Sequence, residues 1–316
     1  MLVAFVKFIP TSVMKYQKSI DSIVFAAASE RSYSNYRVKF ARYLEDYYQM
    51  IRKPRVKWYR KLFDAVVPYN QRTVVITSDG RTSIFYLCFV RCNQAVILNG
   101  LGSYEKSYFV RWLFINANFF KKDIIIFSQS HRDFRYLRRY SRVPVYWVPG
   151  SGGTERLLGK SRVPLLVTRY RKLRKMRKDI EEALKVFKEI DVVGIDKSKK
   201  IGMFGKLHLK GRKNQNEIFN TSEVFLQING YGEGIPHTLV DAICSNMDVF
   251  IHRKCWIKFG FYKFMTNSIK LELIHDQYYL IHHSSDIHAR LKSVVNEKAI
   301  FSKLQNFLRC HYLQIR

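Results

Sequence analysis

Short apolar runs alternate along the chain with longer stretches whose apolar residues follow a helical spacing. In the first half the runs are TVVITS (73–78), AVILNG (95–100), DIIIFS (123–128) and VPVYWVPG (143–150). Runs of this length, rich in Val and Ile, are typical of buried strands, and helical stretches between them are typical of βα units. The pattern therefore predicts a parallel sheet covered by helices. The opening MLVAFVKFIP (1–10) predicts a first strand, because Lys7 interrupts the apolar order of a secretion signal.

A Gly-rich segment divides this pattern in two. PGSGGTER (149–156) places Pro149 and three glycines between apolar runs, a composition typical of a hinge. The pattern then restarts with strands at 163–168, 191–195, 223–228 and 248–252, a helix over 176–190 and a helix from Pro236. We predict an α/β protein with two Rossmann-like, doubly wound domains, residues 1–150 and 151–316, facing a central cleft. The carboxyl ends of the strands at that cleft are the predicted ligand site.

Composition and charge narrow the class of partner. The chain has 316 residues, of which 47% are hydrophobic, enough for two cores. Its 55 Lys and Arg against 25 Asp and Glu give a net charge of +30, which favours nucleic acid, anionic lipid or a phosphorylated substrate. The 5 cysteines form no CxxC pair, which indicates a reducing compartment. No uncharged apolar run approaches the roughly 18 residues that span a bilayer, so we predict a cytoplasmic protein.

Two carboxylates flank the start of the predicted helix at Pro236. Glu233 follows the strand at 223–228 and can point into the cleft, whereas Asp241 lies more than one turn inside the helix. Proline suits the first helical turn, and the backbone N–H groups of Thr238 and Leu239 at that end favour a phosphate. Carboxylates for hydroxyl groups beside a helix start for phosphate predict a nucleotide-sugar site. Each acid judged alone is more often a solvated surface group.

The stretch GEGIPHTLVDAI (232–243) resembles the EGxP…E signature of the family 4 retaining glycosyltransferases, which have the two-domain B-type fold. Glu233 matches the first acid of that signature, and Asp241 stands where the family usually has Glu. The resemblance implies that Glu233 contacts the transferred sugar and that Asp241 contacts the nucleoside ribose. It also implies that the residues between them, Gly234, Ile235 and Pro236 with Thr238 and Leu239, bind the donor.

Two further segments are similar to the same family, and the similarity extends over residues 73 to 252. PLLVTRYRKLRK (164–175) resembles the strand and the two cations that hold the donor diphosphate, which implies roles for Arg169 and Arg174, with Lys175 adjacent. A fixed cation there stabilises the departing diphosphate more in the transition state than in the ground state. ILNGLGSYEKS (97–107) resembles a Gly-rich strand end, where Gly100 and Gly102 allow close approach. In SQSHRDF (128–134), His131 is either the neighbour of a helix cap, which is the favoured interpretation, or a group that faces the substrate.

The implied activity is retaining transfer of a sugar from a nucleoside-diphosphate sugar to a glycan or lipid-linked glycan, as in surface polysaccharide or lipopolysaccharide synthesis. No cofactor or metal is implied, because no Asp-x-Asp pair or His/Cys cluster falls where a diphosphate would need one. The first seventy residues lack the family's Gly-rich turn and following His, and CSNMDVFIHRKCW (244–256) lacks its Gly-x-Pro. These departures predict an altered acceptor side and leave a decayed, inactive enzyme as an alternative.

The basic character of the chain has two further explanations. KWYRKLF (57–63), wound as a helix, carries aromatic and aliphatic residues on one side and Lys and Arg on the other. Such a helix either packs on its own sheet or lies on an anionic membrane, which would place the protein on the inner face of the membrane. The rival class is a nucleic-acid-binding protein without catalysis, favoured only by charge and aromatic content. It leaves Glu233 and Asp241 unexplained, so nucleic acid is the less favoured partner.

Overall fold

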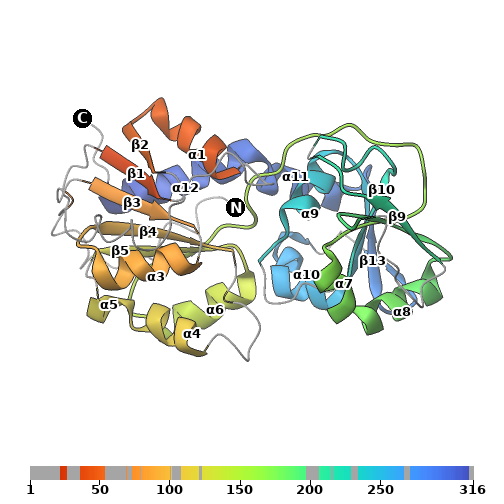
Figure 1. Ribbon diagram of the computed structural model, residues 1–316, viewed down its shortest axis with the longest axis horizontal. Coiled ribbons are helices and arrows are strands. Elements are labelled where there is room, and N and C mark those ends of the chain that lie inside the picture. The colour runs from red at the N-terminus through yellow and green to blue at the C-terminus, as the bar shows by residue number, and fades with distance from the viewer. Residues whose placement is uncertain are drawn as a thin grey trace.

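The computed structural model describes residues 22–26, 36–53, 69, 73–78, 80–99, 101, 108–120, 123–196, 206–214, 216–228, 234–266 and 271–312. The predicted strand at 1–10 and the predicted amphipathic helix at 57–63 lie outside these residues. Among the described residues, the chain builds two α/β halves, each around one sheet made mainly of parallel strands (Figure 1). The α/β class and the parallel sheets predicted from the sequence are thereby confirmed.

The first sheet has 6 strands in the order β2-β1-β3-β4-β5-β6. All of its neighbouring strands pair in parallel. The strands are β1 (Ser22–Ala26), β2 (Gln49–Lys53), β3 (Thr73–Thr77), β4 (Asn93–Leu98), β5 (Ile124–Ser128) and β6 (Val145–Trp147). The last four match the predicted strands within a few residues. The apolar runs of β3, β4 and β5 are buried on both faces, as is typical of parallel strands, whereas the edge strand β6 is only half-buried.

Helices cover both faces of this sheet, and alternate residues of each strand supply the two cores. Ile23 and Phe25 of β1 pack with α1 (Tyr36–Glu45) and α12 (Glu297–Tyr312). Val24 and Ala26 face the opposite side, which carries the remaining helices of this half. These are α3 (Gly80–Phe89), α4 (Tyr108–Ile115), α5 (Ala117–Phe120) and α6 (His131–Tyr140). The period of two along the strand therefore determines which layer each residue joins.

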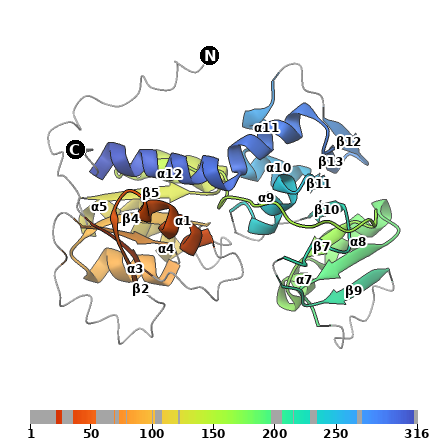
Figure 2. The same ribbon diagram turned by 90° about the horizontal axis from the view of Figure 1, so that it is seen from above.

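The C-terminal helix α12 returns to the first half (Figure 2). Phe301, Leu304 and Leu308 belong to the core beneath β1, β3, β4 and β5. At its end, the hydroxyl of Tyr312 donates to the carbonyl of Gln94 in β4 over 3.1 Å. Residues 297–312 thus pack with the N-terminal half, which differs from a C-terminal domain running to 316, because the apolar side of this helix matches the first sheet.

The second sheet has 7 strands in the order β12-β13-β11-β10-β7-β8-β9. They are β7 (Leu165–Val167), β8 (Ile190–Val193), β9 (Leu207–Gly211), β10 (Val224–Gln227), β11 (Asp248–His252), β12 (Glu272–Ile274) and β13 (Tyr278–Ile281). The strands β7 to β11 pair in parallel, as predicted for β7, β8, β10 and β11, whereas β9 was not among the predicted strands. The edge differs from a purely parallel sheet, since β13 pairs antiparallel with both β11 and β12. The tight turn at His275 and Asp276, both with positive φ, allows this hairpin.

The helices of the second half also form two layers. α7 (Tyr170–Lys175) and α8 (Arg177–Val186) pack on one face of the sheet. The other face carries α9 (His237–Cys244), α10 (Arg253–Phe259), the 3₁₀ helix η4 (Phe261–Phe264) and α11 (Asp286–Val295). The helix predicted over 176–190 ends earlier, at Val186, because β8 begins at Ile190.

The Gly-rich segment predicted as a hinge runs directly against α9. At Gly150 (φ +97°), a side chain would bring a Cβ to 2.9 Å from Cγ1 of Val240, and at Gly153 a Cβ would collide with the Val240 carbonyl. These glycines therefore permit the connecting segment, residues 149–156, to approach α9 closely. The contact fixes where α9 lies relative to the segment that joins the two halves.

Candidate functional site

A cavity of about 830 Å³ opens at the carboxyl ends of β7, β8, β9 and β10 in the second half. Its cationic lining residues are Arg169, Arg171, Lys172, Arg212 and Lys213, and Asp196 lies on the same wall. The start of α9 contributes Pro236, His237 and Thr238. Parallel strands bring their carboxyl ends to one edge, so loops far apart in sequence gather there. The arrangement presents cations and a helix start to an anionic ligand.

The floor of the cavity depends on a glycine that follows β8. Gly194 has φ +101°, a conformation that side chains rarely adopt, and a Cβ there would collide with the carbonyl oxygen of Thr168. Thr168 directly follows β7 and is itself buried. The two strand ends can therefore approach closely only because residue 194 lacks a side chain.

The first turn of α9 faces the cavity, because Pro236, His237 and Thr238 are among the lining residues. Pro236 is the N-cap (φ −62°, ψ 139°) and makes no side-chain cap hydrogen bond. The first N–H groups of a helix have no acceptor within the helix, which applies to Thr238. The Leu239 N–H donates to the Pro236 carbonyl over 3.1 Å, which differs from the prediction that it is available to phosphate. Of the two N–H groups predicted to bind phosphate, only that of Thr238 therefore remains a candidate.

Asp241 does not line the cavity and is only 2% exposed. Its Oδ1 accepts the Thr154 N–H over 2.9 Å, and its Oδ2 lies 3.4 Å from the Arg156 guanidinium. The carboxylate thus holds the connecting segment against α9. This geometry differs from a ribose contact, because the side chain is already engaged on the inner side of the helix.

His237 links the cavity to Asp241, and sequence reasoning missed it. Its Nδ1 lies 2.6 Å from the hydroxyl of Ser151, and its Nε2 lies 3.5 Å from Oδ2 of Asp241. Burial lowers the pKa of His237, and Arg156 lowers it further, against the opposing effect of Asp241. The lowered pKa favours the neutral form of this imidazole at the N-terminus of α9. Only its position directly after Pro236 could have drawn attention to it.

The remaining residues of the signature have mixed placements. The side chains of Ile235 and Leu239 are buried in the apolar core of the second half and do not line the cavity. Gly234 is buried where a Cβ would collide with the Asn99 carbonyl at the end of β4, so it allows the two halves to touch. Glu233, together with Gly100 and Gly102, lies outside the described residues.

The basic helix α7 presents its cations in different directions. Arg169 is the N-cap of α7 and lines the cavity, as does Lys172 one turn later. Arg174 and Lys175 are exposed but are not among the lining residues, which differs from their predicted place beside the diphosphate. Packing of Leu173 into the core fixes this orientation, because a helix with one side buried has only one side free to face the cavity.

His131 lies where the two halves meet. Ser130 caps α6, and its hydroxyl accepts the Asp133 N–H, so the interpretation of His131 as a cap neighbour is confirmed. The His131 ring packs edge-on against Trp147 and Tyr262, and burial lowers its pKa. Since Tyr262 belongs to η4, this histidine joins the halves by aromatic contact.

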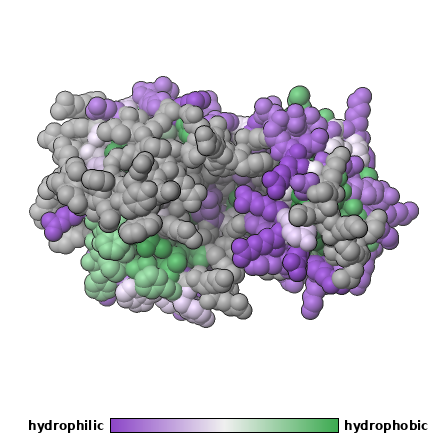
Figure 3. All heavy atoms as spheres, in the orientation of Figure 1, coloured by the Kyte–Doolittle hydropathy of each residue, from purple (hydrophilic) through white to green (hydrophobic). Residues whose placement is uncertain are grey.

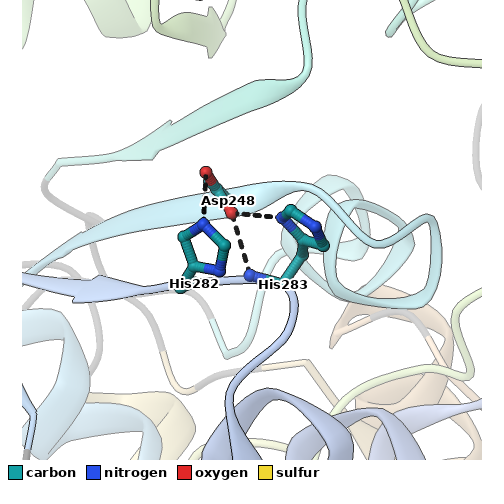
Figure 4. A group of neighbouring side chains, drawn as sticks. All are labelled: Asp248, His282 and His283. Carbon is teal, nitrogen blue, oxygen red and sulfur yellow. Dashed lines mark hydrogen bonds and ion pairs between the residues drawn. The ribbon is translucent and has the colours of Figure 1, made fainter.

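A group of possible metal ligands lies away from the cavity, namely Asp248, His282 and His283 (Figure 4). Asp248 is the first residue of β11, whereas the cavity lies at the opposite, carboxyl ends of the parallel strands. None of the three side chains lines the cavity.

No family model and no curated protein matches the sequence. Among solved structures, the crystal structure of Anabaena HepE in complex with UDP is similar to this chain, with a TM-score of 0.58 and 8% identity. That similarity covers 92% of this chain and 100% of the HepE chain. The GtfA/B complex aligns with a TM-score of 0.48 and 14% identity, over 79% of this chain and 59% of its own. The likeness to HepE shows a shared fold.

Among the helices that the structure describes, none combines the length and apolar character needed to cross a bilayer.

Proposed function

We propose that the protein is a glycosyltransferase that uses a nucleoside-diphosphate sugar. The observation that carries the proposal is the cavity, where Arg169, Lys172 and the start of α9 converge beyond parallel strands. Cations and helix N-termini are the groups that bind phosphate in such folds. Anabaena HepE, which shares the fold, is in complex with UDP, which supports a nucleoside diphosphate as the ligand here.

In this proposal the diphosphate lies among the cations and the first turn of α9. Arg212 and Lys213, which follow β9, face the same space as Arg169 and Lys172. As the sugar–phosphate bond breaks, negative charge grows on the diphosphate, and fixed cations stabilise that charge. The likeness of GEGIPHTLVDAI to the family 4 signature supports a retaining reaction in which Glu233 contacts the transferred sugar. We assign Asp241 the positioning of α9, through Thr154 and Arg156, rather than a ligand contact.

The acceptor is proposed to be a glycan on a membrane lipid, reached from the cytoplasmic face. We call Tyr108, Phe109, Trp112, Phe119 and Phe120 the aromatic surface. These side chains of α4 and α5 are between 41% and 74% exposed, and Phe109 stacks on Trp112. Figure 3 shows hydrophobic residues gathered over the part of the first half that carries α3, α4 and α5. Exposed aromatic clusters of this kind mark interaction sites.

Charge makes an anionic bilayer the favoured occupant of the aromatic surface. Arg135, Arg138 and Arg139 are exposed on α6, which lies beside α4 through the Arg111–Tyr136 contact. Aromatic residues enter the interfacial layer while neighbouring cations bind anionic headgroups. The net charge of +30 adds a long-range attraction to such a surface.

Nucleotide binding is tested by calorimetry with UDP and a panel of other nucleoside diphosphates. The Arg169→Ala, Lys172→Ala double variant should bind at least tenfold more weakly, because two lining cations are lost. The matched control is Arg174→Ala, Lys175→Ala, which removes the same charge from exposed positions of α7 that do not line the cavity. Equal affinity in both double variants, or binding of none of the nucleotides, would contradict the proposal.

Membrane binding is tested by flotation with vesicles of phosphatidylglycerol or of phosphatidylcholine alone. We expect binding to the anionic vesicles that weakens as salt rises. Phe109→Ser with Phe119→Ser should reduce it, whereas Leu157→Ser, a similarly exposed apolar residue elsewhere, should not. If those serines instead abolish a dimer seen by sedimentation and leave flotation unchanged, the aromatic surface contacts a second copy.

A further inference from the structure

Two consecutive histidines and a carboxylate meet at the edge of the second sheet that is remote from the cavity. The antiparallel pairing of β11 and β13 places Val249 opposite Ile281. The chain beyond Ile281 therefore continues past Asp248, the first residue of β11. Figure 4 shows the rings of His282 and His283 directed toward the Asp248 carboxylate from this segment.

The ligand atoms of the three side chains lie within 4.8 Å of one another. Nδ1 of His283 is 2.8 Å from Oδ1 of Asp248, and Nε2 of His282 is 3.7 Å from Oδ2. Bonds of 2.0–2.2 Å in a tetrahedral site place neighbouring ligand atoms about 3.3 Å apart. Small rotations of the side chains would bring these atoms to that spacing around one ion.

Surrounding hydrogen bonds hold the group in place. The hydroxyl of Ser284 lies 2.7 Å from Nδ1 of His282, so that ring nitrogen is occupied while Nε2 faces the carboxylate. The backbone N–H of His283 donates to Oδ1 of Asp248 over 2.8 Å. A second hydrogen bond on a ligating histidine or carboxylate fixes its orientation toward a metal. The Asp248 side chain is mostly buried, whereas both rings are 47% exposed, which gives an ion access from solvent.

We propose that Asp248, His282 and His283 bind a divalent transition-metal ion, with Zn²⁺ as the reference ion. Two imidazoles and one carboxylate suit Zn²⁺, Co²⁺, Ni²⁺ or Cu²⁺, whereas Mg²⁺ and Ca²⁺ prefer oxygen ligands alone. Water completes the coordination on the exposed side. The bound ion joins β11 to the segment between β13 and α11, so its role is to stabilise this edge and not to act on the sugar donor.

Binding is measured on the full chain without a histidine tag, in a Cys310→Ser background, because Cys310 is an exposed thiol that could also bind the ion. Calorimetry with Zn²⁺ at pH 7.5 should give one ion per chain and a melting temperature that rises with Zn²⁺. Mg²⁺ should give neither.

The deciding variant is His282→Gln with His283→Gln, which changes two exposed rings and so preserves the core. It should bind Zn²⁺ at least tenfold more weakly and lose the rise in melting temperature. The matched control, His208→Gln, changes a comparably exposed histidine on β9 and should bind as the parent does. Asp248→Asn should also weaken binding. Unchanged affinity and stoichiometry in the double histidine variant, or no Zn²⁺ binding by the parent, would overturn the proposal.

Discussion

Asp241 offers the sharpest test of how the signature stretch works, because the sequence and the structure give it different roles. The family resemblance implies a ribose contact, so that Asp241→Asn would weaken nucleotide binding and leave stability unchanged. The structure has the carboxylate buried against Thr154 and Arg156. If Asp241 instead positions α9 from a buried site, Asp241→Asn should lower the free energy of unfolding more than it weakens nucleotide binding.

The expected magnitude follows from the contacts. The Arg156 side chain is 11% exposed and the Asp241 side chain 3%, so the pair is largely shielded from solvent. Removing one partner of a buried pair costs about 3–5 kcal/mol, because the other charge remains buried. We expect that loss for Asp241→Ala. Asn keeps an acceptor for the Thr154 N–H, so Asp241→Asn should lose about 1–3 kcal/mol.

The assay is urea unfolding followed by tryptophan fluorescence, with UDP calorimetry on the folded variants. Arg156→Met provides a double-variant cycle with Asp241→Ala, and the two losses should be non-additive by at least 1 kcal/mol, because both remove the same pair. The refuting result is Asp241→Asn with wild-type unfolding free energy and UDP affinity weakened tenfold or more. That outcome would restore the ribose contact.

Three further predictions follow from other parts of the molecule. Gly194→Ala should weaken UDP binding tenfold or more and lower the melting temperature, because a Cβ at φ +101° collides with the Thr168 carbonyl beside the cavity. Calorimetry measures the affinity and thermal unfolding the melting temperature, and wild-type values of both would contradict the reasoning. Burial lowers the pKa of His288 to about 4, below its unfolded value, so the stability that its neutral form provides is full above pH 6.5 and is lost as pH falls toward 4. That loss should reach about 3 kcal/mol, and His288→Gln should remove most of this pH dependence of urea unfolding. Glu233→Gln should reduce donor turnover on the order of a hundredfold with little change in melting temperature. An unchanged rate of donor hydrolysis would show that Glu233 does not act on the transferred sugar.

Much of the local structure was readable from the sequence. The strands that became β3 to β8, β10 and β11 were predicted within a few residues, because buried parallel strands are continuous apolar runs. The helix after Pro236 and the Gly-rich connection were predicted for the same kind of reason, since proline and glycine restrict or free the backbone wherever they occur. The hairpin of β12 and β13 was missed, because its register depends on pairing with β11, which is distant in sequence.

Which residues face the cavity was decided only by the tertiary structure. The sequence contains Arg169, Arg171, Lys172, Arg174 and Lys175 in one basic run, and no property of that run distinguishes the first three, which line the cavity, from the last two, which do not. Packing of Leu173 sets the rotation of α7 and so makes the distinction. Arg212 and Lys213 join the site from beyond β9 because parallel strands end at a common edge.

The contacts of Asp241 and the packing of α12 were likewise decided only by the tertiary structure. Spacing placed Asp241 on the helix after Glu233, but only the fold brings Arg156 to its carboxylate, because that pair spans 85 positions of sequence. The return of α12 to the first sheet likewise depends on an apolar surface formed by β1, β3, β4 and β5, which all lie in the first half of the chain. Local periodicity specifies elements, since it depends on neighbouring residues. Partners of buried charges and apolar surfaces are specified by packing, since they depend on where the chain brings those elements together.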